Sequence, residues 1–198
     1  MKKVLFSVLF MFLMLPAFSQ TIEGGVTFDW ISKSQLQRDE NIKQVQNVLF
    51  TDKTIYKYPK KEFKAEYAAV WKDKDHLKTY EEVLRGKKED ADNYYCGFNL
   101  KNGLLIAYGI QPKKDMKHIY YYDAMGHLIF VDNFSSAYPK FPYESSQYYK
   151  NGELVAKYYY VSDQDQYVFD AKRKFKGRWY KEKMYNRNAK VIMTRSNY

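Results

Sequence analysis

The chain has 198 residues and a formal net charge of +10; 45% of its residues are hydrophobic and 19% are aromatic. This length supplies one domain with a sizeable core, and the single cysteine excludes a disulfide within the chain. The 21 tyrosines and 13 phenylalanines favour an antiparallel sheet, because a tyrosine packs its ring against a core while its hydroxyl contacts water.

Residues 1–19 have the order of a cleavable secretory signal peptide. Two lysines precede an apolar run at 4–15, and Ala-Phe-Ser at 17–19 is a small-x-small cleavage site. The apolar run is too short to span a bilayer, which needs about 20 residues. We therefore expect cleavage near Ser19 and Gln20, export to the periplasm, cell surface or medium, and no transmembrane segment in the mature chain.

Residues 20–92 are predicted to be a helical N-terminal region. Ser32 or Ser34 is suited to cap a helix that runs to about Phe50. A second helical stretch is expected from Pro59 to a stop at Gly86. The apolar stripe of the first helix comprises Leu36, Ile42, Val45, Val48 and Leu49, and that of the second comprises Phe63, Tyr67, Val70, Leu77, Tyr80, Val83 and Leu84.

Residues 93–198 are predicted to form β-hairpins, because turn pairs separate short aromatic and β-branched runs. The pairs are Asn102-Gly103, Met125-Gly126 and Asn151-Gly152, and a type I′ turn suits both Asn-Gly pairs. We predict an α+β fold in which N-terminal helices pack on an antiparallel, hairpin-rich meander of four or five hairpins, forming one domain with 20–92. Cys96 is expected to be a buried small hydrophobic residue; the alternative is pairing with a second chain.

The hairpins look like weak internal repeats with unequal spacing, which favours a meander over a solenoid. The best copies are YYYDAMGHLIFVD from Tyr120 and QYYKNGELVAKYYY from Gln147. In two poorer copies Arg173 and Ala189 replace the turn glycine, so we expect those turns to differ or to be strained.

The Tyr120 segment resembles a YD repeat of the Rhs type. The Gln147 segment resembles the Tyr-Tyr-x-Asn-Gly-x-Leu unit of MORN-like repeats in YwqK-type antitoxin components. The resemblance covers about residues 98–198, roughly half of the chain. It implies a β-hairpin scaffold used for packing or contact, without catalytic residues, and it suggests a toxin-neutralising role.

The basic excess lies entirely at the C-terminus. Residues 171–198 contain ten Lys or Arg and one acid, a local charge of +9, whereas residues 20–170 sum to −1. If this region is a strand, alternate basic residues line one face and attract polyanions; the alternative is that they keep the sheet soluble and protect its edge strands. The anion-binding candidates are Lys172, Arg173, Lys174, Lys176 and Arg178, and the candidate aromatic contacts are Trp179, Tyr180 and Tyr185.

No catalytic or metal motif stands out, so we predict no metal and no cofactor. The histidines at 76, 118 and 127 match no zinc spacing, and neither a Gly-rich phosphate loop nor a dinucleotide fingerprint occurs. We favour an exported, non-catalytic module that contacts an anionic envelope polymer, a lipid headgroup or a partner protein; export disfavours nucleic acid. The alternative is a cell-wall or glycan hydrolase that uses two of the carboxylates Asp123, Asp132, Glu144, Glu153, Asp163, Asp165 and Asp170.

Overall fold

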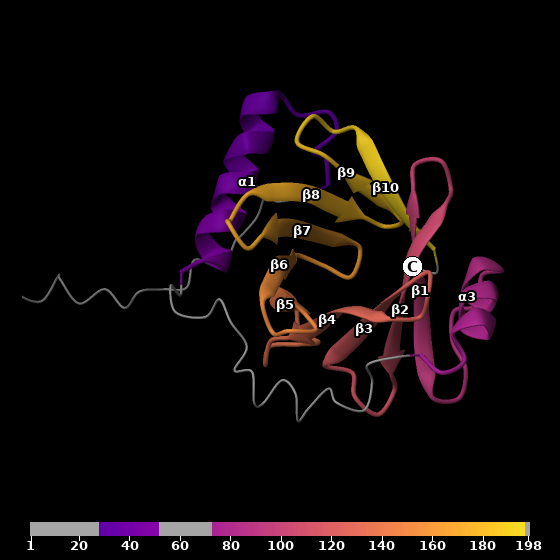
Figure 1. Cartoon of the computed structure of the whole chain (residues 1–198). Coiled ribbons are helices and arrows are strands. Elements are labelled where there is room, and N and C mark those ends of the chain that lie inside the picture. The colour runs from indigo at the N-terminus through magenta and orange to yellow at the C-terminus, as the bar shows by residue number, and fades with distance from the viewer. Residues whose placement is uncertain (1–27, 52–72, 197–198) are drawn as a thin grey trace, which may run out of the picture.

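The computed structural model describes residues 28–51 and 73–196. The predicted signal peptide and the predicted helix start at Pro59 lie outside these residues. Residues 73–75 are not helical, so the prediction of one continuous helical stretch from Pro59 to Gly86 is wrong. The described part comprises two helices, α1 (Gln35–Leu49) and α3 (His76–Leu84), followed by ten strands (Figure 1). The strands are β1 (Asn93–Leu100), β2 (Leu105–Pro112), β3 (His118–Asp123), β4 (Leu128–Phe134), β5 (Tyr143–Tyr149), β6 (Leu154–Tyr160), β7 (Asp165–Asp170), β8 (Phe175–Tyr180), β9 (Lys183–Tyr185) and β10 (Val191–Ser196).

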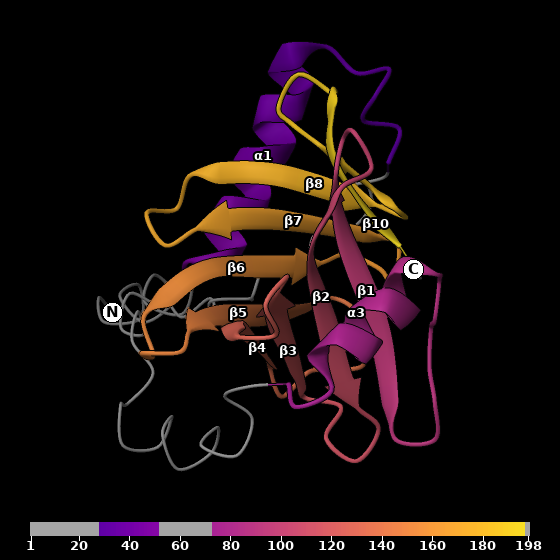
Figure 2. The same ribbon diagram turned by 45° about the vertical axis from the view of Figure 1, so that its right-hand side comes forward.

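The antiparallel meander closes into a barrel. Each strand pairs with the next along the chain, and β10 returns to pair with β1, with Gly97 opposite Ser196 and Leu100 opposite Met193 (Figure 2). This confirms the α+β, hairpin-rich prediction. Closure leaves the described strands without a free edge, so protection of edge strands does not explain the C-terminal basic residues.

All five hairpins have the same type of turn. In each, a residue with φ between +58° and +86° donates its N–H to the carbonyl three residues earlier, at 2.8–3.0 Å. Asn102 and Asn151 do not have positive φ, so the turn is a type I turn followed by a left-handed residue and a bulge, and the type I′ prediction is wrong. The left-handed residues are Gly103, Gly126, Gly152, Arg173 and Ala189.

Arg173 and Ala189 occupy this left-handed position with a side chain, as the sequence led us to expect. A non-glycine residue there is strained by about 1 kcal/mol. Because the strands run up and down in chain order, all five turns lie at one end of the barrel, the turn end. The loops that join one hairpin to the next lie at the opposite end, the loop end.

Helix α1 covers the outer wall at β6 and β7 (Figure 1). Ser34 caps it, with Gln37 completing a capping box, which confirms one of the two predicted caps. Ile42 and Val45 are buried in a cluster that includes Tyr167 of β7. Leu36 is 70% exposed, contrary to its predicted place on the stripe, because six residues rotate it by about 240° from Ile42.

Helix α3 covers β1 and β2 on another part of the outer wall. Its Val83 is buried there, and the Tyr80 hydroxyl donates a 3.3 Å hydrogen bond to the Leu105 carbonyl. Gly86, with φ of +96°, follows the end of the helix as predicted. Leu77 and Leu84 are more than half exposed, so the predicted apolar stripe is narrower than expected. The helices therefore cover separate parts of the wall and leave the interior to the strands.

Candidate functional site

Aromatic side chains divide the barrel interior into two parts. Alternate residues of each strand face inwards, and four of these are Phe98, Tyr121, Tyr158 and Trp179, which we call the aromatic layer. The ring centroid of Phe98 lies 5.5 Å from that of Tyr121 and 6.0 Å from that of Trp179. All four residues line both of two cavities, so the layer separates a cavity at each end of the barrel.

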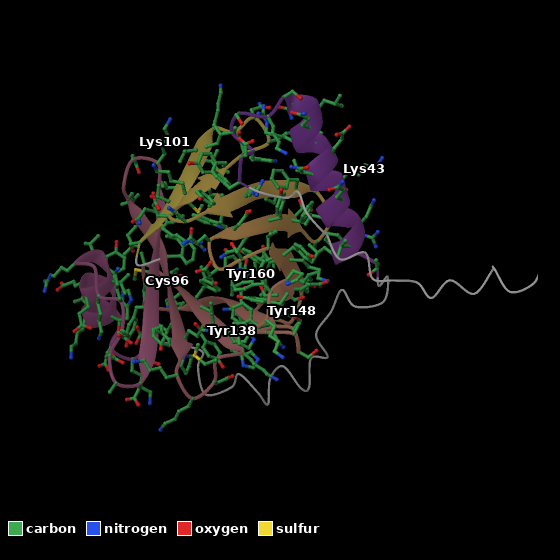
Figure 3. The ribbon with its side chains drawn as sticks, turned by 180° about the vertical axis from the view of Figure 1, so that it is seen from behind. Lys43, Cys96, Lys101, Tyr138, Tyr148 and Tyr160 are labelled. Atoms are coloured by element: carbon green, nitrogen blue, oxygen red, sulfur yellow. The ribbon has the colours of Figure 1, made fainter. Side chains whose placement is uncertain are left out.

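The loop-end cavity is the larger, at about 260 Å³. Its wall beyond the aromatic layer includes Phe134, Tyr143 and Tyr160. The rings of Tyr143 and Tyr160 stack with centroids 4.5 Å apart, and Phe134 meets Tyr160 edge-on at 5.6 Å (Tyr160 in Figure 3). Tyr94 and Asp163 are exposed and also line the cavity, so it reaches the surface.

The turn-end cavity is smaller and more apolar, at about 200 Å³. Beyond the aromatic layer it is lined by Ala107, Phe130, Met184 and Met193, with Gln147 as its polar side chain. Methionine side chains adapt to ligands of different shape. The turn-end cavity is therefore mainly apolar, whereas the loop-end cavity combines aromatic rings with polar groups that include Gln111, Gln166 and Arg195.

Asp132 lies at the level of the aromatic layer. On β4 it shares the inward face with Phe130, which lines the turn-end cavity, and Phe134, which lines the loop-end cavity. The side chain is fully buried, and the Tyr121 hydroxyl donates a 2.8 Å hydrogen bond to its Oδ2. Burial raises the pKa of Asp132 to about 7, an effect partly offset by Tyr121 and the Gln147 amide, which favour the charged form.

The other interior acids hold their protons near neutral pH. Burial raises the pKa of Tyr121 and Tyr160 well above the usual tyrosine range, and it raises that of Tyr158 too. Desolvation also raises the pKa of Cys96 to about 12, so its thiol is a poor nucleophile; the residue is half-buried and lines the loop-end cavity, whereas the sequence predicted that it is buried. Among the described interior acids, Asp132 has the pKa nearest to neutrality.

Among the C-terminal basic residues, Arg195 lines the loop-end cavity. Its guanidinium lies 4.8 Å from the ring centroid of Trp179 and donates a 2.9 Å hydrogen bond to Oε1 of Gln166. A second hydrogen bond, from Nε, reaches the Lys181 carbonyl at 2.9 Å. The wall of the loop-end cavity thus carries the positive charge of Arg195, fixed by these hydrogen bonds, opposite the tyrosines of β5 and β6.

The predicted anion-binding residues do not form one row along a strand. Residues 172–174 lie in the turn between β7 and β8, because β8 begins only at Phe175. Lys172, Lys174 and Lys176 are exposed. Arg178 is instead fully buried: its Nε donates a 2.7 Å hydrogen bond to Asp165, and its guanidinium lies among the rings of Phe28, Trp30 and Tyr167. The sequence-based prediction of Arg178 on an exposed basic face is wrong.

The predicted aromatic contacts occupy two different settings. Trp179 faces the interior and is buried. Tyr180 stacks on Phe28 with ring centroids 3.5 Å apart, and Tyr185 meets the same ring at 5.3 Å. Only Trp179 therefore lines the cavities.

The dispersed histidines and carboxylates do not converge. His118 lies 2.6 Å from the Asp115 carboxylate and His127 is exposed, and no group of three or more His, Cys, Asp or Glu among residues 28–51 and 73–196 is placed to hold a metal. Asp132 faces the interior, whereas Asp165 pairs with Arg178 on the outer side of the wall. These two buried candidates therefore do not form the carboxylate pair that a glycosidase requires.

No family model, curated protein or solved structure in the comparisons matches the chain. Neither described helix is long and apolar enough to cross a membrane.

Proposed function

We propose that the protein is a non-catalytic binding protein that holds a small, largely apolar molecule inside the barrel. The observation that carries this proposal is the pair of cavities on either side of the aromatic layer. Protein interiors are normally close-packed, and side chains around a void lose contacts. Apolar cavities with a few placed polar groups are the usual form of a small-molecule site.

The fold supports this proposal. Barrels of about eight strands are just wide enough to be filled by side chains or to hold one small ligand, and this barrel has ten. The loop-end cavity is the better candidate, because it is larger, reaches the surface and combines apolar rings with tyrosine hydroxyls. Exposed Tyr94 lies at its mouth.

The first test is titration with N-phenylnaphthylamine, a neutral aromatic dye whose emission rises in apolar surroundings. We expect saturable binding of one dye per chain, with energy transfer from Trp179. Ile119→Trp fills the loop-end cavity and should weaken binding at least about tenfold, because the ring occupies the dye's volume. Ala107→Trp fills the turn-end cavity instead and shows which space is used.

The matched control is Leu104→Trp, which adds the same ring at a residue that is 57% exposed. Its dye affinity should equal that of the unsubstituted protein. Circular dichroism establishes that all three variants fold. Undiminished binding by both cavity-filling variants would place the dye outside the barrel and refute the proposal.

A second candidate function rests on the exposed lysines at the turn end. Lys172, Lys174 and Lys176 lie within five residues of one another, and none forms an ion pair with another described residue. We infer that they contact an anionic envelope component, such as lipid headgroups. This use of the C-terminal charge is compatible with a ligand inside the barrel, because the lysines lie outside it.

Sedimentation with phosphatidylglycerol vesicles tests this surface. Binding at low salt should fall as salt rises, and changing the three lysines to Gln should abolish it. Lys114, Lys117 and Lys140 are exposed on loops at the other end of the barrel, and their triple Gln variant removes the same charge. Equal loss in both triple variants would show a net-charge effect, and the turn-end surface would have to be abandoned.

A further inference from the structure

The polar pair at the centre of the barrel restricts which ligands fit. Tyr121 lines both cavities, and its hydroxyl donates a hydrogen bond to Oδ2 of Asp132, with the two oxygens 2.8 Å apart. The Tyr121 oxygen can therefore only accept a hydrogen bond from a molecule in the cavity. A ligand group placed against Tyr121 must be a donor.

The second carboxylate oxygen of Asp132, Oδ1, is also a hydrogen-bond acceptor. It is buried and accepts no hydrogen bond of normal geometry from any described residue, although the nearby Gln147 amide favours the charged form of Asp132. An acceptor buried in this way carries a desolvation cost that is only partly compensated, and a cationic ligand against Tyr121 would reduce it. No described Lys, Arg or His forms an ion pair with Asp132.

The surroundings of the pair are aromatic. Tyr158 and Tyr160 interact electrostatically with Asp132 and line the loop-end cavity together with Phe134 and Tyr143. Ring faces attract cations, most strongly where water is excluded. A carboxyl group among ring faces is the combination that holds an organic ammonium group.

We propose that the barrel ligand is a small aromatic or apolar amine whose ammonium group donates to the Tyr121–Asp132 pair. This inference rests on the proposed function and adds the chemical class of the ligand. Tyr121 makes the first contact with the amine, and Asp132 orients the Tyr121 hydroxyl and balances the charge. The ring of the amine lies against the aromatic layer.

Arg195 favours a ligand of the opposite charge. Its guanidinium lines the same cavity and would favour a carboxylate ligand. Cys96, Tyr121, Tyr158 and Tyr160 also face the interior, and the raised pKa of each keeps it uncharged at neutral pH. Asp163 also lines the cavity but is exposed at its mouth, so Asp132 and Arg195 are the charged groups inside that decide which ligand charge is preferred.

Three ligands of similar shape distinguish these cases: phenethylamine, phenethyl alcohol and hydrocinnamate. Each is measured by displacement of N-phenylnaphthylamine at about pH 7.5. We expect the amine to bind at least about tenfold more tightly than the alcohol, because it gains a charge-assisted hydrogen bond. Asp132→Asn and Tyr121→Phe should each reduce that preference to less than about threefold, while the affinity for the alcohol stays similar.

Tyr138→Phe is the matched control, because it removes a tyrosine hydroxyl from the same cavity away from Asp132 (Tyr138 in Figure 3). It should keep the preference for the amine. Equal binding of amine and alcohol by the unsubstituted protein, or the tightest binding for hydrocinnamate, overturns the inference while leaving the proposed function intact. If neither the dye nor any of the three ligands binds, the proposed function itself fails.

Discussion

Replacing Arg178 with Met should lower the free energy of unfolding by about 3–5 kcal/mol, measured by urea denaturation at neutral pH. The arginine is fully buried and paired with Asp165, and its guanidinium lies 4.6 Å from the ring centroid of Tyr167. Removing one partner of a buried ion pair leaves the other charge uncompensated. Burial already raises the pKa of Asp165 against the opposing effect of Arg178, so loss of Arg178 should raise that pKa further.

Two further variants isolate the cause. Arg178→Met combined with Asp165→Leu removes both charges and should recover most of the lost stability, because an apolar pair of similar volume has no unpaired charge to bury. Lys176→Ala, at an exposed position on the same strand, should change stability by less than about 0.5 kcal/mol. If Arg178→Met were within about 1 kcal/mol of the unsubstituted protein, the buried pair would not contribute the stability expected of it.

Replacing Asp132 with Asn should remove a pH dependence of stability. The pKa of Asp132 is about 7 in the folded protein and near the ordinary value of 3.8 when unfolded. Between these values the folded state binds more protons than the unfolded state, so stability falls as pH rises and is lowest above about 7. The loss between about pH 5 and pH 8 amounts to roughly 2–3 kcal/mol.

The measurement is the difference in unfolding free energy between Asp132→Asn and the unsubstituted protein, taken at about pH 5 and at about pH 8. Other titrating groups cancel in this difference, so Asp132→Asn should gain about 2–3 kcal/mol relative to the unsubstituted protein as pH rises. Asp163→Asn, at an exposed residue, should show no such gain. A constant difference for Asp132→Asn would mean that Asp132 ionises normally in the folded barrel.

The local features of the fold were predictable because they depend on neighbouring residues. Ser34 caps α1, Gly86 follows the end of α3, and the left-handed turn position repeats five times, including at Arg173 and Ala189. Closure of the barrel was not predictable, because the pairing of β1 with β10 joins residues about 100 positions apart. The type I′ prediction failed because Asn-Gly also suits a type I turn followed by a bulge.

The candidate site was largely hidden in the sequence. The C-terminal charge excess predicted a basic face at residues 172–178, but a turn occupies the first part of that segment and Arg178 is buried against Asp165. Among the predicted anion-binding and aromatic residues, only Trp179 lines the cavities, and among the candidate carboxylates Asp163 lies at the mouth of one of them. Asp132 appeared as one of seven scattered carboxylates; the available signal was a lone acid between apolar residues in the strand-like segment Phe-Val-Asp-Asn-Phe. Which face of that strand is enclosed depends on barrel closure.

The most direct measurement is a crystal structure of the protein grown with N-phenylnaphthylamine. We predict ordered density for one dye molecule inside the barrel, in the loop-end cavity, against the aromatic layer and the rings of Phe134 and Tyr160. Dye that is ordered only on the outer wall, with the interior closed by movement of the aromatic side chains, would contradict the proposal that the barrel interior is a binding site.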